Sequence, residues 1–293
     1  MQYGKVKSRG ERAFDAAVLA VLVLFSLLII LPFMNLLSIS VSNEYAIMGG
    51  KVTVWPVGFS FQSYLRVFQT QTILSAYLNT ILVAVFGCTS SLVLTSMAAY
   101  PLAYGKFAGK GLYNAIIMIT MWFSGGMIPS FIVMSKLRLV DSLLSLIFAS
   151  LLSAYNILIL RTFFTSISIS LVESARLDGA NDFKVLFSII MPLSKAGLAT
   201  IGLWVFVAHW NDYMNPLLYL RSVNKYTLQL VLREMVLTSE SSSLVELIEG
   251  NRTALPEQLK HAAIVVAMVP VLAIYPFAQR YFVSGILLGS VKE

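Results

Sequence analysis

The segment 173–180 holds the most informative group of polar residues in this chain, with the sequence Glu-Ser-Ala-Arg-Leu-Asp-Gly-Ala between two long apolar runs. Ser170 followed by Glu173 fits a capping box, in which both side chains satisfy backbone N–H groups in the first turn of a helix. Gly179 favours the left-handed backbone that ends such a helix. The spacing therefore predicts a short helix and a glycine turn, where a membrane protein would need only a loop. These residues suit a segment that docks onto another protein and do not suit a catalytic site.

A second short helix is predicted after the glycine turn, with Asn181 or Asp182 as its cap. Its apolar residues recur at three- and four-residue steps and would form one face: Phe183, Leu186, Phe187 and Ile190. Pro192 lacks an amide donor and disfavours helix at Met191, so we expect the chain to bend there. Helices lying on the lipid surface are the alternative interpretation of this segment.

No residues are spaced for ATP hydrolysis or for metal binding. A phosphate-binding loop needs a glycine-rich run ending in Gly-Lys-Ser or Gly-Lys-Thr, and the segments 50–52 and 109–111 lack that hydroxyl residue. Cys88 is the single cysteine, and the two histidines lie far apart in sequence. We therefore expect no catalytic residues, no metal site and no internal disulfide.

The composition is that of an integral membrane protein. Of 293 residues, 58% are hydrophobic and only 12% are charged, against about 25% charged in an average soluble domain. The net charge of +7 comes from 21 scattered Lys and Arg residues, which suits topology signals and anionic lipid better than nucleic acid. Six apolar runs predict transmembrane helices over residues 16–43, 77–99, 111–135, 142–160, 196–211 and 262–279.

The charges around these runs predict the orientation. A basic leader, residues 1–15, precedes the first run, so we expect both termini in the cytoplasm. Residues 16–293 then form one transmembrane domain with a cytoplasmic loop at 161–195 and outer loops at 40–72 and 221–260. The first run is too long for a cleaved signal peptide. Within the outer loops, a short interfacial helix is expected near 61–68, and 239–243 is the most flexible part.

Two other classes of function compete with a docking permease. An autonomous proton- or ion-driven transporter would place charges inside its spans, and no charge lies at the centre of any run. A structural or assembly membrane protein would explain the hydrophobicity, but it would leave the docking segment without a use.

The docking segment resembles the EAA loop of ABC-importer permeases, which carries the residue pattern found here at Glu173, Ala175, Asp178, Gly179, Ala180 and Pro192. Ser174 departs from the usual alanine but remains small. Nearly the whole chain is similar to the carbohydrate-importer permeases related to the maltose transporter. The matching segments are 98–103, 128–129, 210–213, 216–217 and 289–292. The pattern is nearest to the subgroup for aldouronate and alginate oligosaccharides, although Glu293 stands where glycine is common.

This resemblance implies an all-α integral membrane protein with six transmembrane helices and the type I (MetI-like) ABC-importer permease fold. It implies a bacterial inner-membrane subunit that imports oligosaccharides, possibly acidic ones; a permease for another solute class is the alternative. The implied partners are a second homologous permease, two ATPase subunits that bind ATP and Mg, and an external solute-binding protein. The residues implied to couple ATP hydrolysis to transport are Glu173, Ala175, Asp178, Gly179, Ala180, Phe183, Leu186, Phe187 and Pro192.

A sugar path needs amide and aromatic side chains, because sugars present hydroxyl groups and flat apolar faces. The candidates are Tyr77, Asn79, Tyr155, Asn156, Trp210, Asn211 and Tyr213, with His209 and Asn215 beside them. The alternative for each is structural, since Asn also joins membrane helices and Trp and Tyr form interfacial belts. Asp212 would repel an acidic sugar, and we expect it near the outer end of its span. The basic residues of the outer loop, Arg221, Lys225 and Arg233, are expected to be solvated.

Overall fold

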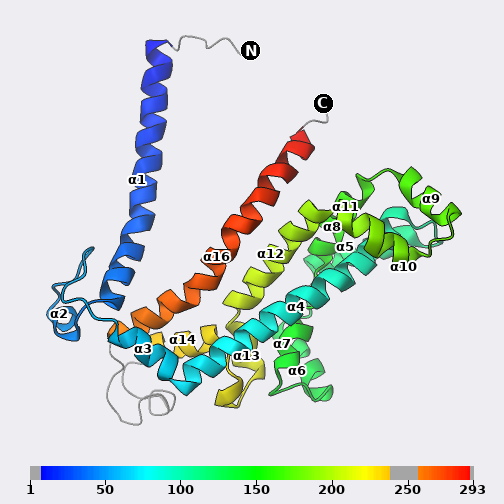
Figure 1. The fold of residues 1–293 in the computed structure, drawn as a ribbon. Helices are drawn as coiled ribbons and strands as arrows, with labels where there is room; N and C mark the ends of the chain where they lie inside the picture. The colour runs from blue at the N-terminus through cyan, green and yellow to red at the C-terminus, as the bar shows by residue number, and fades with distance from the viewer. Residues whose placement is uncertain (1–7, 238–256, 291–293) are drawn as a thin grey trace. The chain divides into compact units, whose positions relative to one another are not determined.

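The computed structural model describes residues 8–237 and 257–290, with the backbone alone in 277–290, and every regular element in these ranges is a helix (Figure 1). The all-α prediction is therefore confirmed for the described residues. The chain divides into two compact units, Met1–Gln69 with Ser239–Val266 and Thr70–Thr238 with Ala267–Glu293.

Unit 1 contains one long apolar helix and two short ones: α1 (Arg9–Ser40), α2 (Glu44–Met48) and α3 (Gln62–Gln69). A capping box begins α1, because Ser8 Oγ accepts the N–H of Glu11 at 3.2 Å while Glu11 Oε2 accepts the N–H of Ser8 at 2.7 Å. The most apolar window of α1 is unburied in the structure, as expected of a helix that faces lipid. The short helix predicted near 61–68 is observed as α3.

The loop after α1 folds back onto the end of that helix. Asn35 Nδ2 donates to the carbonyl oxygen of Thr53 at 2.6 Å, and Ser38 Oγ donates to that of Val54 at 2.5 Å. The hydroxyl groups of Ser40 and Tyr64 lie 2.8 Å apart. These bonds give the first outer loop a defined structure beside its span.

Unit 2 is built around three helices that pack together: α4 (Gln71–Tyr104), α8 (Ala154–Thr165) and α12 (Lys195–Asn211). Small residues let α4 and α12 approach closely. Cys88 Sγ donates to the carbonyl oxygen of Gly202 at 3.3 Å, and a Cβ added to Gly202 would lie 3.3 Å from Leu92. The core between these helices includes buried Leu160, Phe164 and Ile201.

The third predicted span is broken. Its two parts are α5 (Lys110–Trp122) and α6 (Met127–Lys136), and their axes differ by 113°. Gly126 has φ +85° at the start of α6, a backbone that glycine adopts without steric cost. The prediction of one continuous helix over 111–135 is therefore wrong, because hydropathy carries no information about a backbone turn within an apolar run.

The fourth predicted span is also bent, by 58° between α7 (Leu143–Ala149) and α8. The side chain of Ser153 caps α8 by accepting the N–H of Asn156, so a new helix begins inside the apolar run. The fifth span ends at Asn211, where Asp212 is extended. The separate helix α13 (Met214–Tyr219) then follows.

The remaining described elements are η2 (Val223–Lys225), α14 (Leu228–Leu237) and α16 (Glu257–Ser290). The last helix passes through Pro270 and Pro276 without a break. The second outer loop thus begins with helices, and its segment 239–243 lies outside the described residues. Among the described residues, three unbroken helices are long and apolar enough to span a membrane, or up to six if each bent pair is one span.

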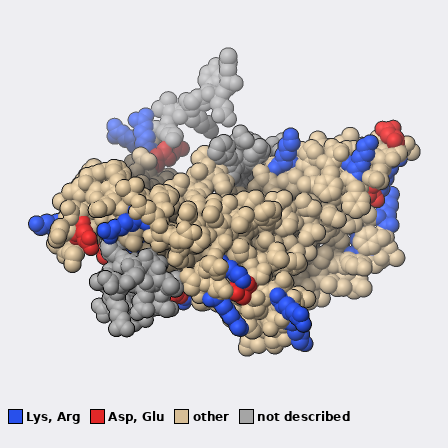
Figure 2. Space-filling view, turned by 60° about the horizontal axis from the view of Figure 1, so that its bottom comes forward, with Lys and Arg blue, Asp and Glu red and all other residues tan. Residues whose placement is uncertain are grey.

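Within unit 2, the short helices α9 (Ile169–Leu177) and α10 (Asp182–Val185) lie at one end, and α6 and α13 lie at the opposite end (Figure 1). Charged side chains occur in small groups separated by wide uncharged areas (Figure 2).

Candidate functional site

The coupling loop, residues 161–195, contains the predicted helix pair with a shifted start. Ser168 is the cap of α9, and its Oγ accepts the N–H of Ser170 at 3.3 Å. Ser170 lies inside the helix and contacts Ser168 Oγ at 2.7 Å. The predicted capping box between Ser170 and Glu173 is therefore wrong. Glu173 is exposed, and its carboxylate has no bonding role in starting the helix.

The glycine turn, residues 178–181, has the predicted geometry. Gly179 has φ +82°, and an added Cβ there would have nothing within 4 Å, so backbone conformation alone selects glycine. The N–H of Ala180 donates to the carbonyl oxygen of Ala175 at 2.9 Å. Asn181 caps α10, because its Oδ1 accepts the N–H of Lys184 at 2.8 Å. The left-handed backbone predicted at Gly179 and the helix cap predicted at Asn181 are both confirmed.

The bend that was expected at Met191, before Pro192, lies further along the chain. After α10 the helix continues as a π-helical turn, η1 (Leu186–Ile190), and as α11 (Met191–Leu193). The 86° bend falls at Ser194, between Leu193 and Lys195. A π-helical turn changes the hydrogen-bond pattern of the helix just before the proline. The helix can therefore pass Pro192 without a break at Met191.

The two faces of the coupling loop differ in burial. Leu186 is 3% exposed and lies in the core of unit 2 with Val185 and Ile190, whereas Phe183 is 63% exposed and Phe187 41% exposed. The predicted single apolar face is therefore divided, because Leu186 packs against this chain's own helices. Ala175 is buried and Ala180 half-buried on the same underside, while Glu173, Asp178, Gly179 and Pro192 are exposed.

An ion pair that the sequence reasoning missed spans the glycine turn. Arg176 Nη2 lies 2.7 Å from Asp182 Oδ1 and Nε lies 3.2 Å from the same oxygen. Hydrogen bonds from Arg176, and then from Tyr100, hold the pKa of Asp182 below its usual value. The sequence signal for this ion pair was a basic and an acidic residue six positions apart, on either side of the glycine turn.

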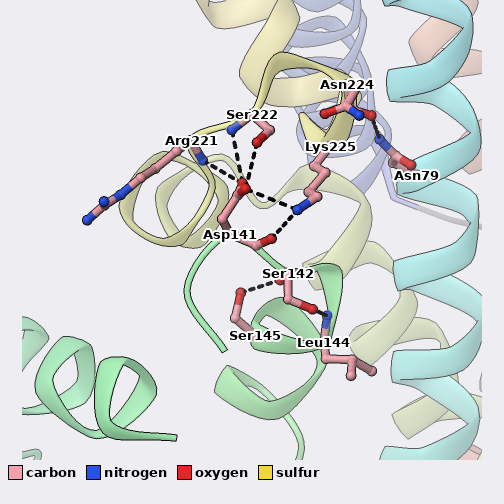
Figure 3. A network of polar contacts seen from close by, with 9 residues as sticks. All are labelled: Asn79, Asp141, Ser142, Leu144, Ser145, Arg221, Ser222, Asn224 and Lys225. Carbon is pink, nitrogen blue, oxygen red and sulfur yellow. Dashed lines mark hydrogen bonds and ion pairs between the residues drawn. The ribbon is translucent and has the colours of Figure 1, made fainter. Parts of the chain in front are cut away.

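Several candidate solute-path residues have structural partners. Trp210 is 1% exposed, and its Nε1 donates to the carbonyl oxygen of Ala267 at 3.0 Å. The ring of Tyr77 meets that of Trp210 edge-on at 5.7 Å. Asn79 Nδ2 donates to the carbonyl oxygens of Asn224 and Tyr226, at 2.9 and 3.1 Å (Figure 3). These three candidates join elements of unit 2.

Tyr155 and Asn156 are adjacent in α8 but differ in environment. Asn156 is buried. Tyr155 is exposed, and its ring lies 6.0 Å from that of Trp204 on α12. Trp204 was not among the candidates, because a tryptophan inside an apolar run gives no sequence signal for exposure. His209, which had been grouped with the candidates, is 4% exposed and is a packing residue.

Asn211 and Tyr213 remain accessible at the end of α12. Gln229 Nε2 donates to Asn211 Oδ1 at 3.4 Å, and the Arg233 guanidinium lies 5.4 Å from the centre of the Tyr213 ring. We call these four residues the outer polar cluster. Arg233 is thus held over an aromatic ring.

Acidic side chains near this end of unit 2 have partners of their own. Asp212 accepts hydrogen bonds from the backbone and side chain of Asn215, at 3.1 and 2.7 Å. Asp141 lies in the turn between α6 and α7 and bonds this turn to the segment that follows α13 (Figure 3). It accepts the N–H groups of Arg221 and Ser222, at 3.0 and 2.9 Å, and the Ser222 hydroxyl at 2.6 Å.

Lys225 completes this Asp141 cluster. Its Nζ lies 3.0 Å from Asp141 Oδ2 and also donates to the Asp141 carbonyl oxygen. The hydrogen bonds from Ser222, followed by those from Arg221 and Lys225, hold the pKa of Asp141 well below its usual range. Lys225 was expected to be solvated, yet the structure gives it a fixed partner.

The comparisons with known proteins now decide the family. The family of binding-protein-dependent transport system inner membrane components matches residues 91–287. The chain belongs to this family. The permease is therefore a multi-pass inner-membrane protein of a binding-protein-dependent transport system.

Two relatives from Bacillus subtilis (strain 168) cover nearly the whole permease. It is 39% identical to the polygalacturonan/rhamnogalacturonan transport system permease protein YtcP, over 96% of this chain and 99% of the relative. It is 28% identical to the arabinooligosaccharides transport system permease protein AraQ, over 92% of each chain.

The fold of the permease also matches a solved structure. That structure is a crystal structure of a bacterial ABC transporter involved in the import of the acidic polysaccharide alginate. The TM-score is 0.87 at 34% identity, over 95% of this chain and 99% of the matched chain. The predicted ABC-importer permease fold is thereby confirmed.

Proposed function

We propose that this permease imports oligosaccharides in an ATP-driven complex and that acidic oligosaccharides are its substrates. Support comes from what its relatives are named for. The 39% identical relative is named for polygalacturonan and rhamnogalacturonan, and the 34% identical structure for alginate. Polygalacturonan and alginate are both built from uronic acids, so each carries a carboxylate on its sugar units.

The partners in this proposal are a second homologous permease, two ATPase subunits and an external solute-binding protein. The ATPase subunits would bind ATP and Mg and perform the hydrolysis. The observation that carries the proposal is the two-sided coupling loop, whose underside is buried in the core of unit 2 while Phe183 is 63% exposed. Phe187, four residues further on, is also exposed, and exposed apolar residues that are grouped and rimmed by polar ones mark protein interaction sites.

The exposed side of the coupling loop would meet the ATPase through four residues: Glu173, Asp178, Phe183 and Phe187. Gly179 would set the angle between the two short helices, and Pro192 would stiffen the end of the second. Ala175, Ala180 and Leu186 would act from the underside, by fixing the loop to the helices that move. The nine predicted coupling residues then divide into a docking group of four, an anchoring group of three, and two residues, Gly179 and Pro192, that shape the loop.

This assignment also sets the orientation. With the coupling loop in the cytoplasm, the Asp141 cluster and the outer polar cluster lie toward the outer face, because they occupy the opposite end of unit 2 (Figure 1). We propose cytoplasmic termini as well, on the ground of the basic leader.

The accessible candidates would contact the sugar, and the buried and half-buried ones would position them. Asn211, Gln229, Tyr213 and Arg233 offer amides, an aromatic face and a cation, the groups that an acidic sugar needs. The exposed rings of Tyr155 and Trp204 offer a second aromatic surface. Tyr77, Asn79, Asn156 and Trp210 would hold the helices that carry these groups.

Uptake by cells tests the substrate class. We expect deletion of this permease to abolish uptake of labelled oligogalacturonides or oligoalginates, and the intact gene to restore it. Loss of only neutral oligosaccharide uptake would contradict the acidic class. Loss of amino acid or peptide uptake, with sugars unaffected, would overturn the carbohydrate assignment.

A further inference from the structure

Two tyrosines one turn apart on α4 are hydrogen-bonded to the segments on either side of the first coupling helix, α9. The Tyr104 hydroxyl donates to the carbonyl oxygens of Phe164 and Ile167, just before α9. The Tyr100 hydroxyl donates to Asp182 Oδ1 at 3.0 Å, just after the glycine turn. The two rings lie 5.6 Å apart. The end of α4 therefore carries fixed attachments to both sides of α9.

The attachment at Tyr100 is shared with the ion pair across the glycine turn. Asp182 Oδ1 accepts hydrogen bonds from both Tyr100 and Arg176. Arg176 belongs to α9, Asp182 to α10 and Tyr100 to α4. One carboxylate oxygen thus connects the two coupling helices to a membrane-spanning helix.

Packing between α4 and the coupling loop is incomplete at this point. A pocket of about 220 Å³ lies there, lined by Met97, Tyr100, Pro101, Gly105, Arg176, Asp182, Phe183 and Leu186. Tyr100 and Asp182 both line this pocket, so their hydrogen bond directly connects α4 to the coupling loop where packing is open.

The exposure of Arg176 and Asp182 indicates that their ion pair contributes little to folding. The side chains of Arg176 and Asp182 are 44% and 62% exposed, and ion pairs so exposed typically add less than about 1 kcal/mol to stability. Tyr100, by contrast, is 7% exposed and has a fixed ring. An exposed acid held by a buried hydroxyl is well placed to transmit a displacement of the loop.

We propose that Tyr100 is a positioning residue for transport, which passes the motion of the coupling loop to α4 through Asp182. This inference rests on the proposed function, in which an ATPase subunit moves the coupling loop. Without the Tyr100 hydroxyl, the ATPase still docks and hydrolyses ATP, but α4 follows the loop less closely. Less sugar then crosses the membrane for each ATP hydrolysed.

The test uses the complete transporter, with both permeases, both ATPase subunits and the binding protein, in proteoliposomes. The variant is Tyr100→Phe, and its control is Tyr113→Phe, which removes a hydroxyl that has no hydrogen bond among the described residues. Sugar uptake and ATP hydrolysis are measured on the same vesicles. We expect Tyr100→Phe to lower the ratio of sugar to ATP by roughly threefold to tenfold, the range for one lost hydrogen bond.

Two further results decide the interpretation. The ATPase subunits should copurify with Tyr100→Phe as with the wild type, and the effect of Tyr100→Phe should disappear in an Asp182→Ala background, since the two residues share one bond. An unchanged ratio, a loss of copurification or an undiminished effect in that background would each overturn the inference. A wild-type complex without sugar-stimulated ATP hydrolysis would instead overturn the proposed function.

Discussion

Gly87 on α4 lies directly against His209 on α12, so closely that a Cβ added to Gly87 would lie 2.5 Å from His209 Nε2. The contact is with the ring itself, because the same Cβ would lie 2.9 Å from both Cδ2 and Cε1. The buried imidazole thus fills the space that the missing side chain leaves. His209 therefore packs α12 against α4.

Gly87→Ala is expected to destabilise the permease by about 1 to 3 kcal/mol, because overpacking forces helices apart. Thermal unfolding in detergent measures the effect. Gly111→Ala is the control, since nothing lies within 4 Å of its added Cβ. Equal melting temperatures for the two variants would contradict the close contact, and His209→Ala should relieve the effect of Gly87→Ala.

Asp141→Asn should lower stability at neutral pH, because four hydrogen bonds then meet an uncharged group. The lowered pKa of Asp141 means that its stabilising effect is present above the ordinary aspartate pKa, about 3.9. It is lost as pH falls through the lower pKa of the folded protein. Melting temperatures of wild type and Asp141→Asn should therefore differ at pH 7 and still at about pH 4, and should converge only as pH falls further. A difference that does not shrink below about pH 4 would count against the ionised cluster.

Gly179→Pro should abolish transport-coupled ATP hydrolysis while membrane insertion persists. Proline fixes φ near −65°, whereas Gly179 has φ +82°, so the two coupling helices would lose their angle. Gly50→Pro is a matched control, because Gly50 also has positive φ, open space around it and a donor N–H. Normal coupled hydrolysis in Gly179→Pro would refute the coupling function of the loop.

Glu173→Ala and Ser168→Ala should affect different properties: the first should affect ATPase docking and transport, and the second should affect stability. Ser168 caps α9, and removal of a cap costs about 1 kcal/mol, so its variant should melt earlier. Glu173 is exposed and does not cap the helix, so its variant should melt normally but show weaker ATPase copurification and less sugar uptake. A stability loss in Glu173→Ala equal to that in Ser168→Ala would remove the case for a docking residue.

Tyr213→Ala should lower sugar uptake severalfold, if the outer polar cluster contacts the solute as proposed. The side chain offers an exposed aromatic face and holds Arg233 in place. Tyr45→Ala serves as the control, because Tyr45 is an exposed tyrosine in unit 1. Wild-type uptake of acidic oligosaccharides by Tyr213→Ala would show that the cluster lies off the path.

The features that could be predicted from sequence were those set by local chemistry. A positive φ at Gly179 and a cap at Asn181 depend on a few neighbouring residues, and both are observed. The apolar runs also correspond to helices, because burying a backbone in lipid requires its hydrogen bonds to be made within the segment.

The features that escaped prediction depend on distant parts of the chain or on backbone turns. Leu186 is buried because it meets the core of unit 2, which its helical spacing alone does not show. Asn79 bonds to backbone 145 residues away. The break at Gly126 lies inside an apolar run, where hydropathy is the same for a straight helix and a bent one.

ATP hydrolysis by the assembled transporter tests the central claim most directly. The permease is purified with its partner permease and ATPase subunits, reconstituted, and supplied with binding proteins loaded with different solutes. We predict that a binding protein loaded with an acidic oligosaccharide stimulates hydrolysis several-fold over the empty protein. Stimulation by a binding protein loaded with an amino acid or a peptide, and not by one loaded with sugar, would contradict the account.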